Sequence, residues 1–260
     1  MTGVDFISFG MDHDLSNGAM GHLAEGEIHV WRANISGQES PLNGDYGILS
    51  DLEKARADRL RIAKARQRFI RSHAILRQIL AKYLDRLPPQ IEIDNLPGGK
   101  PALAEKSVPG SEILRFNLAH SQDWMVVSVS RDFETGIDLE FEDPKVDFKQ
   151  VSKHYFLTDE QTWLANLPEE AQLAAFYRLW TCKEAVLKAD GRGIGQGLGR
   201  IHIQFDTDES ARGFFAGEGT GQSWLIRSFS PVDGYDAALA FKTRASAAVE
   251  PKFSYYHWSG

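Results

Sequence analysis

The sequence contains almost no cysteine, since Cys182 is the single one among 260 residues. One cysteine excludes an internal disulfide and a cysteine-rich zinc site. No apolar run approaches the roughly 20 residues that a membrane-spanning helix needs. The first fifteen residues carry acids and no basic region, which argues against a secretory signal. Together these absences favour a cytoplasmic protein without a membrane partner.

Net positive charge is also lacking, because the formal net charge of −7 at pH 7 argues against general nucleic-acid binding. The chain is long enough for one large domain or two small ones. Its composition, with 42% hydrophobic and 25% charged residues, is ordinary for a soluble globular protein. Lysines and arginines are nevertheless concentrated between residues 54 and 86. That segment is either a site for an anionic small ligand or a solvated helix face, and the charge run alone favours the solvated face.

Hydrophobic periods predict strands and one helical region in the first half of the chain. Residues 25–35 alternate and predict a strand. Ser50 and Glu53 form a capping-box pattern that opens a helical region reaching Leu84, and Pro88 follows its end. Further strands are predicted over residues 90–94, 112–121 and 123–130.

The second half continues with a strand over residues 135–141 and two helices. Thr158 and Gln161 form a second capping-box pattern, and a long helix covers residues 169–189 before Gly191. Strands are predicted over residues 200–206, 223–229 and 235–241, and the last sixteen residues show no pattern that predicts an element. This order predicts an α+β fold with antiparallel sheets, in two halves that meet near residue 135.

The strand over residues 135–141 carries two carboxylates, Asp138 and Glu140, within an apolar pattern. Side chains two residues apart point the same way and lie roughly 7 Å apart. Two carboxylates that close repel each other unless a cation lies between them. Hard cations such as Mg²⁺ prefer oxygen ligands. The pair is therefore either half of a Mg²⁺ site or an exposed acidic face, and by itself it favours the acidic face.

The long helix over residues 169–189 offers a second pair of charges. Glu184 and Lys188 are four residues apart, which places them on one helix face. They either complete a metal site and bind a phosphate or form a salt bridge worth about 0.2–0.5 kcal/mol. The pair alone favours the salt bridge. Cys182 in the same helix is expected to be an inert packing residue.

Three further segments hold candidate ligand contacts. Lys100 lies between glycine and proline in "GGKP", which lacks the spacing of a P-loop. The segment 191–197, "GRGIGQG", follows a helix rather than a strand, so it predicts a flexible turn and not a dinucleotide site. His120 is equally a structural histidine or a phosphate contact. No G-x-S-x-G elbow accompanies it, so a serine hydrolase is not indicated.

Taken in order, the segments "GGKPAL", "FNLAHS", "GIDLE" and "FYRLWTCKEAVLKADGRGI" resemble the 4′-phosphopantetheinyl transferase superfamily, in its larger, monomeric, surfactin-synthetase-activating type. The similarity runs from about residue 50 to about residue 205. Each motif is weak alone, but the ordered set of four is highly specific and outweighs the separate alternatives. The resemblance implies an enzyme of the holo-[acyl-carrier-protein] synthase kind. Such an enzyme moves the 4′-phosphopantetheine arm of coenzyme A to a serine of an apo acyl-, aryl- or peptidyl-carrier protein.

The resemblance also implies the metal and the catalytic residues. Asp138, Glu140 and Glu184 would hold Mg²⁺. Lys188 would contact the pyrophosphate and assist the leaving group, adenosine 3′,5′-bisphosphate. Glu184, or a water that it orients on the metal, would take the proton of the carrier serine. Catalysis of this kind consists mainly of positioning and of neutralising charge.

Coenzyme A contacts follow from the same resemblance. Arg56 would contact the 3′-phosphate, Lys100 would lie near the adenine and the phosphates, and His120 would contact a coenzyme A phosphate, together with Lys188. Members of the family commonly carry serine before this histidine, whereas the chain has Ala119. Ser121 or a backbone N–H is the candidate substitute for the missing hydroxyl.

The fold that the resemblance implies has two similar halves related by a pseudo-twofold axis, each an antiparallel sheet packed with a long helix. Residues 1–135 would form the first half, and residues 136–260 the second half with the metal site. Two other functions stay open. A metal-dependent diphosphate hydrolase would use water as the acceptor, and a non-catalytic relative would only bind coenzyme A or a carrier. Ala119 favours the non-catalytic relative, and the cluster of charges argues against it.

Overall fold

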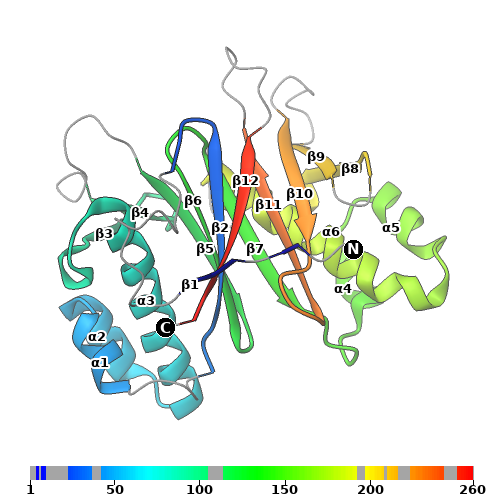
Figure 1. The fold of residues 1–260 in the computed structure, drawn as a ribbon. Helices are drawn as coiled ribbons and strands as arrows, with labels where there is room; N and C mark the ends of the chain where they lie inside the picture. The colour runs from blue at the N-terminus through cyan, green and yellow to red at the C-terminus, as the bar shows by residue number, and fades with distance from the viewer. Residues whose placement is uncertain are drawn as a thin grey trace.

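Two five-stranded sheets lie at the centre of the molecule, with helices on their outer sides (Figure 1). The structure is a computed structural model that describes residues 4–5, 7–9, 23–36, 42–104, 114–191, 197–207, 210–215, 223–242 and 251–259. The first sheet has the order β1 (Ile7–Phe9), β12 (Lys252–Trp258), β2 (Glu27–Asn34), β6 (Trp124–Ser130) and β5 (Arg115–Ser121). The second has the order β7 (Thr135–Phe141), β11 (Tyr235–Phe241), β10 (Trp224–Phe229), β9 (Ser210–Phe215) and β8 (Ile201–Phe205).

Strand pairing is antiparallel in the second sheet and between β2, β6 and β5, as predicted. The first sheet is mixed, because β12 runs parallel to both of its neighbours, β1 and β2. A separate two-stranded ribbon consists of β3 (Ile93–Asn95) and β4 (Pro101–Leu103). The turn predicted for residues 191–197 falls largely on residues 192–196, which lie outside the described residues.

The described helices form two groups in the sequence, one between β2 and β3 and the other between β7 and β8. They are α1 (Leu42–Ile48), α2 (Asp51–Arg59), α3 (Ala63–Leu84), α4 (Phe148–Tyr155), α5 (Thr158–Ala165) and α6 (Glu169–Asp190), with short 3₁₀ turns η2 (Pro88–Gln90) and η5 (Leu198–Arg200). No described helix combines the length and the apolar character that crossing a membrane requires. The arrangement of sheets and helices confirms the α+β class.

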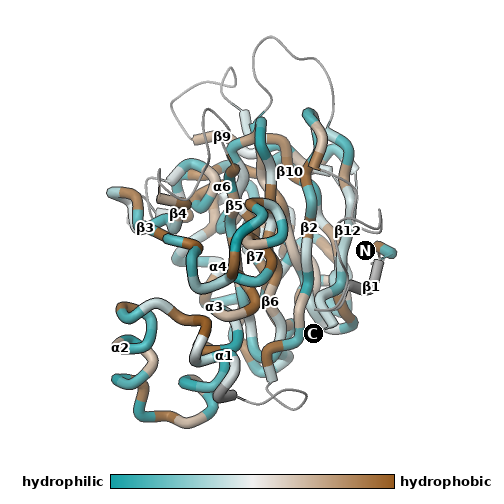
Figure 2. The backbone as a smooth tube through the Cα atoms, turned by 60° about the vertical axis from the view of Figure 1, so that its left-hand side comes forward, coloured by the Kyte–Doolittle hydropathy of each residue, from teal (hydrophilic) through white to brown (hydrophobic). Residues whose placement is uncertain are grey.

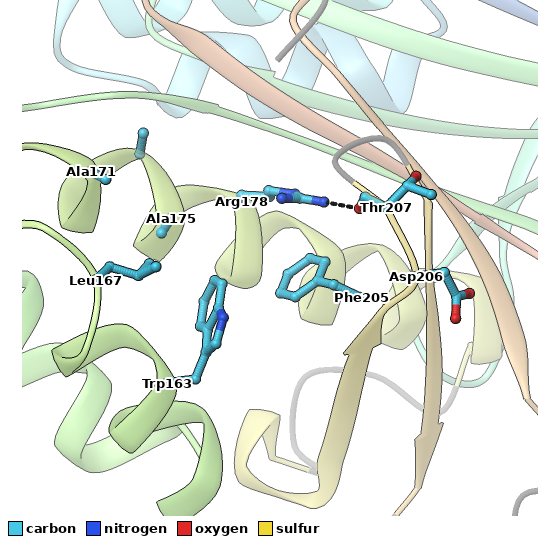
Figure 3. Close-up of a pocket in the computed structure, with 9 residues that line it drawn as sticks. Trp163, Leu167, Ala171, Ala175, Arg178, Phe205, Asp206 and Thr207 are labelled. Carbon is cyan, nitrogen blue, oxygen red and sulfur yellow. Dashed lines mark hydrogen bonds between the residues drawn. The ribbon is translucent and has the colours of Figure 1, made fainter.

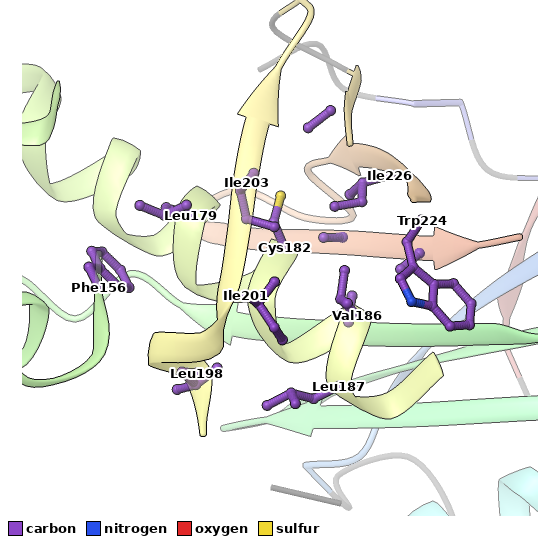
Figure 4. Close-up of a cluster of buried hydrophobic side chains, with 14 of the residues drawn as sticks. Phe156, Leu179, Cys182, Val186, Leu187, Leu198, Ile201, Ile203, Trp224 and Ile226 are labelled. Carbon is purple, nitrogen blue, oxygen red and sulfur yellow. The ribbon is translucent and has the colours of Figure 1, made fainter. Parts of the chain in front are cut away.

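The two 22-residue helices each cover the outer face of one sheet. Helix α3 packs Ile75, Ile79 and Leu80 against the first sheet in one core cluster. Helix α6 packs Cys182 and Val186 against the second sheet in another (Figure 4). A third cluster lies between the inner faces of the two sheets. The order of layers is therefore helix, sheet, sheet, helix.

Local signals explain where several helices begin. Ser50 and Glu53 form the predicted capping box of α2. The predicted helical region breaks at residues 60–62, so α2 and α3 are separate helices. The second capping box was assigned one residue too late: the backbone N–H of Leu157 donates to Glu160, and Thr158 is the first helical residue. Helix α2 lies at the periphery, and most of its residues are hydrophilic (Figure 2).

The predicted division at residue 135 falls between β6 and β7. The N-terminal segment contributes α3 and most of the first sheet, and the C-terminal segment contributes α6 and the second sheet. Strand β12 crosses this division, since residues 252–258 pair with β1 and β2 of the first sheet. The two-domain division and the pseudo-twofold relation of the halves stay predictions.

Candidate active site

Strand β7 places Asp138 and Glu140 on its face toward α6. Gly136 marks that face, because a Cβ added there would lie 2.2 Å from the carbonyl oxygen of Ala185 on α6. Side chains two residues apart point to the same side of a strand, so both carboxylates also face α6. Glu184 precedes Ala185 on that helix. Besides burial, the negative charge of Glu184 raises the pKa of Glu140, and the negative charge of Asp138 raises the pKa of Glu184. The structure therefore brings the three predicted carboxylates to one interface.

Asp138 is buried and pairs with the predicted lysine. The Nζ atom of Lys188 lies 2.6 Å from Oδ1 of Asp138, whose side chain is 6% exposed. The other carboxylate oxygen of Asp138, Oδ2, is buried without a hydrogen-bond partner. A buried carboxylate oxygen with no partner is costly, so a further positive group beside it would be stabilised.

Glu140 and Glu184 lie in surroundings that disfavour their charged forms. Burial and the charge of Asp138 raise the pKa of Glu140 to about 7, although a hydrogen bond from Ser121 opposes the rise. Burial and Asp138 also raise the pKa of Glu184, which is 9% exposed. Several carboxyl groups with raised pKa values at one interface are typical of sites that bind a cation or move a proton.

The chemistry of these residues fits a hard divalent cation. Among the residues that the structure describes, no three His, Cys, Asp or Glu side chains stand close enough together to hold a metal ion as they are. Lys188 supplies the positive charge on one side of Asp138. The oxygen donors are nevertheless of the type that Mg²⁺ prefers. A bound Mg²⁺ would give the unpartnered oxygen of Asp138 a partner, and its charge would lower the pKa values of Glu140 and Glu184.

A groove runs from this interface toward α2 and is formed by two neighbouring cavities of about 270 and 280 Å³. Both cavities share Gly99, Pro101 and Leu118 in their walls. Lys188 lines the first cavity and Arg56 lines the second. The groove therefore connects two predicted ligand contacts that lie far apart in the sequence.

Lys100 lines the first cavity but is already bound by the protein. Its Nζ atom donates to the carbonyl oxygens of Thr135 and Ala189 at 2.9 and 3.3 Å, and it lies 3.7 Å from a carboxylate oxygen of Glu134. Burial lowers the pKa of Lys100 despite the nearby charge of Glu134. Lys100 thus ties the start of β7 to the end of α6, a structural task that the sequence motif did not indicate.

Arg56 lines the second cavity, whereas His120 lies on β5 and lines neither of the two cavities. Arg56 lies over the ring of Phe69, with 5.6 Å between its guanidinium carbon and the ring centre. His120 keeps an exposed side chain, while desolvation and the charges of Lys188 and His73 lower its pKa. The lowered pKa agrees with a position beside several cations, where an anionic ligand would also be stabilised.

Several residues within or beside the sequence motifs are buried or bound by the protein itself. Ala119 is buried in the core between the sheets. The hydroxyl of Ser121 is occupied by Phe141 N–H and Glu140, which argues against its serving as the substitute for a serine at position 119. Lys183, in the motif beside Glu184, is fully buried. Cys182 is buried as well, and burial raises the pKa of its thiol to about 12, which confirms it as a packing residue.

A larger cavity of about 680 Å³ lies elsewhere, between α5, α6 and the end of β8 (Figure 3). Arg178 crosses it, stacks 4.2 Å from the ring centre of Phe205 and donates to the carbonyl oxygen of Thr207. None of the seven predicted site residues lines this cavity. The size of a cavity therefore does not identify the candidate active site in this molecule.

The chain is similar in sequence to a known family and to several of its members. The model of the 4′-phosphopantetheinyl transferase superfamily matches residues 134–240. The 4′-phosphopantetheinyl transferase HetI of Nostoc sp. is 37% identical over 234 residues, which cover 90% of this chain and 94% of HetI. A putative 4′-phosphopantetheinyl transferase of Synechocystis sp. is 32% identical, over 81% of this chain and 86% of its own. The 4′-phosphopantetheinyl transferase psf-1 of Bacillus pumilus is 32% identical, over 61% of this chain and 65% of its own.

Proposed function

The chain belongs to the 4′-phosphopantetheinyl transferase superfamily, and we propose that it transfers the 4′-phosphopantetheine arm of coenzyme A to a serine of an apo carrier protein. The reaction depends on Mg²⁺ and releases adenosine 3′,5′-bisphosphate. The observation that carries the proposal is the meeting of Asp138, Glu140, Glu184 and Lys188 at one interface, from which Lys188 reaches the groove. Relatives named as 4′-phosphopantetheinyl transferases support an enzyme of this type.

Mg²⁺ would be held by Asp138, Glu140 and Glu184. When bound, it would neutralise charge on the diphosphate of coenzyme A. Lys188 reaches the same place from the end of α6, and its ammonium group can turn from Asp138 toward a phosphate on the leaving side. Glu184 has a raised pKa, which suits a base that takes the proton of the attacking serine hydroxyl.

Coenzyme A would lie along the groove that runs from the interface of β7 and α6 toward α2. Arg56 would meet the 3′-phosphate in the second cavity, and His120 would meet a phosphate near Lys188. Lys100 would contribute its charge to the wall of the first cavity while it holds β7 to α6. The carrier would approach from the side of α6 and the segment that follows it. We further propose the larger, monomeric type of the family, acting in the cytoplasm.

The test is mass spectrometry of an apo carrier protein incubated with the chain, coenzyme A and Mg²⁺. We expect a mass gain of roughly 340 Da, one phosphopantetheine, that disappears with EDTA. Breakdown of coenzyme A without a change in the carrier would instead indicate a metal-dependent diphosphate hydrolase. Binding of coenzyme A with neither reaction, across several unrelated apo carriers, would indicate a non-catalytic relative.

A further inference from the structure

The edges of the two sheets meet where β5 lies beside β7, without forming one continuous sheet (Figure 1). Side chains of the first sheet bridge this seam. Asn117 accepts a hydrogen bond from the backbone N–H of Ile137 at 2.8 Å, and Ser121 accepts one from Phe141 N–H at 3.1 Å. The first sheet therefore holds β7 through side chains in place of backbone pairing.

These bridges have a regular spacing. Asn117 and Ser121 are four residues apart on β5, and their partners Ile137 and Phe141 are four residues apart on β7. The two strands thus run in the same direction along the seam, with the same side of β5 turned toward β7. Leu118, which lines both cavities of the groove, lies on the other side of β5, so this one motif supplies both seam contacts and a groove residue.

Ser121 makes one contact that Asn117 does not make. Its hydroxyl donates to Oε2 of Glu140 at 3.0 Å while it accepts from the N–H of Phe141. A single hydroxyl therefore fixes the backbone of β7 and the neighbouring carboxylate at the same time. The bond occupies one oxygen of Glu140 and leaves Oε1 for another partner.

We propose that Ser121 is a positioning residue, which orients Glu140 so that its carboxylate binds a divalent cation together with Asp138 and Glu184. The inference rests on the proposed metal-binding role of these carboxylates. Asp138 repels Glu140, so without a fixed hydrogen bond Glu140 would be free to rotate away from it. Groups that orient metal ligands in this way typically change metal affinity or activity about 10–100-fold when removed.

The chain offers a matched control in Ser128 on β6. Its hydroxyl lies 3.0 Å from the hydroxyl of Thr135 at the other end of β7, so it also joins the first sheet to β7. This hydrogen bond involves no carboxylate. Ser121→Ala and Ser128→Ala each remove one hydroxyl bridge to β7. Only Ser121→Ala removes a hydrogen bond to Glu140.

The experiment titrates Mg²⁺, and Mn²⁺ in parallel, against the full chain while the thermal unfolding midpoint is measured, with no coenzyme A or carrier present. Ser121→Ala is expected to raise the concentration for half of the cation-induced stabilisation about 10–100-fold. Ser128→Ala is expected to lower the midpoint without changing that concentration. Ser121→Thr, which keeps a hydroxyl, is expected to resemble the unchanged chain.

Equal cation responses of Ser121→Ala and Ser128→Ala would overturn the proposal, as would a chain that no divalent cation stabilises. If Ser121→Ala does not fold, Ser121→Cys preserves the volume with a weaker donor and is expected to give an intermediate shift, and an unchanged response would overturn the proposal. The transferase assay is separate. A chain that responds to cations through Ser121 but modifies no carrier would refute the proposed function and leave this inference standing.

Discussion

The chain segments before and after residue 135, called the two halves below, hold their long helices in place through the same kinds of contact. In the first half, Glu53 caps α2 and accepts a 2.7 Å hydrogen bond from Nε of Arg77 on α3. In the second, Glu160 caps α5 and lies 2.7 Å from Nζ of Lys183 on α6. Each glutamate is the third residue of its short helix, and Arg77 and Lys183 stand at the same position counted from Ala63 and Glu169.

The likeness extends beyond the ion pairs. Arg77 also donates to the carbonyl oxygens of Pro88 and Ile91, which follow α3, and Lys183 donates to those of Leu198 and Ile201, which follow α6. In both halves a buried cation therefore joins a short helix, a long helix and the segment after it. Each glutamate thus accepts a hydrogen bond from a free N–H group at the start of its short helix and also neutralises the buried cation.

The difference lies in the residues that follow each buried cation. Gln78 follows Arg77, whereas Glu184 follows Lys183, and only the second half faces its helix with the carboxylates of Asp138 and Glu140. The contacts that hold the long helix are thus common to both halves, while the proposed metal ligands Asp138, Glu140 and Glu184 belong to one half only. Lys183, which is buried in a structural ion pair, therefore lies directly before Glu184, the proposed base.

The largest effect is expected from Glu184→Gln, which removes the proposed base and one metal ligand without changing side-chain volume. Transfer of phosphopantetheine to an apo carrier should fall about 100-fold or more. The rate is measured by mass spectrometry of the carrier, and circular dichroism checks the fold. The matched change in the other half, Gln78→Ala, should leave the transfer rate within a few-fold of the unchanged chain. Equal losses in both variants would remove the functional distinction between the helices.

The next largest effect is on the free energy of unfolding, and it should differ between the ion pairs Lys183–Glu160 and Arg77–Glu53. Lys183→Met should lower the free energy of unfolding by about 3–5 kcal/mol, because it leaves Glu160 charged and 4% exposed. Arg77→Met should cost less, about 1–3 kcal/mol, since Glu53 is 13% exposed and keeps a 3.0 Å contact with His73. Urea unfolding measures both.

Lys153→Met serves as the control for these two variants, because it makes the same kind of change on an exposed side chain. It should change the free energy of unfolding by no more than about 0.5 kcal/mol. Similar losses for Lys183→Met and Arg77→Met would mean that the greater burial of the second pair has no energetic consequence.

The pH dependence of stability should differ in sign between the halves. Glu140 has a pKa of about 7 in the folded chain, above the ordinary value near 4.5, so the folded state holds more protons between these values. Its contribution to stability is therefore full below about pH 4.5 and is lost as the pH rises through 7. Glu140→Gln should be more stable than the unchanged chain at pH 8 by about 1–3 kcal/mol.

Glu53 provides the opposite case for the same measurement. Burial opposes its ionisation, but hydrogen bonds from His73 and Ser50 and the charge of Arg77 lower its pKa to about 2. Its contribution to stability is present above about pH 4.5 and is lost as the pH falls toward 2. Glu53→Gln should therefore be less stable than the unchanged chain at pH 6, and urea unfolding between pH 3 and pH 8 tests both signs.

Local patterns predicted the β7 strand and the α6 helix with nearly the right ends, because a strand period and the Gly191 terminus are written in consecutive residues. The same reasoning missed β12, which pairs with strands that lie far away in the sequence. The motifs predicted that Asp138, Glu140 and Glu184 lie together, and the structure brings them to one interface. The motifs did not indicate that Lys183 and Ser121 fix their surroundings, since those contacts appear only when α5 and β5 are placed.

The smallest expected effect tests the seam that joins the halves. Because the N–H groups of Ile137 and Phe141 point to β5, the N–H of Leu139 between them points there as well, opposite buried Ala119. Ala119→Ser would supply an acceptor, so we expect the free energy of unfolding to rise by about 0.5–1.5 kcal/mol, with the KM for coenzyme A nearly unchanged. Urea unfolding and steady-state kinetics measure the two quantities. A lower KM for coenzyme A without added stability would instead assign position 119 to the groove, and the seam would then serve the ligand as well as the fold.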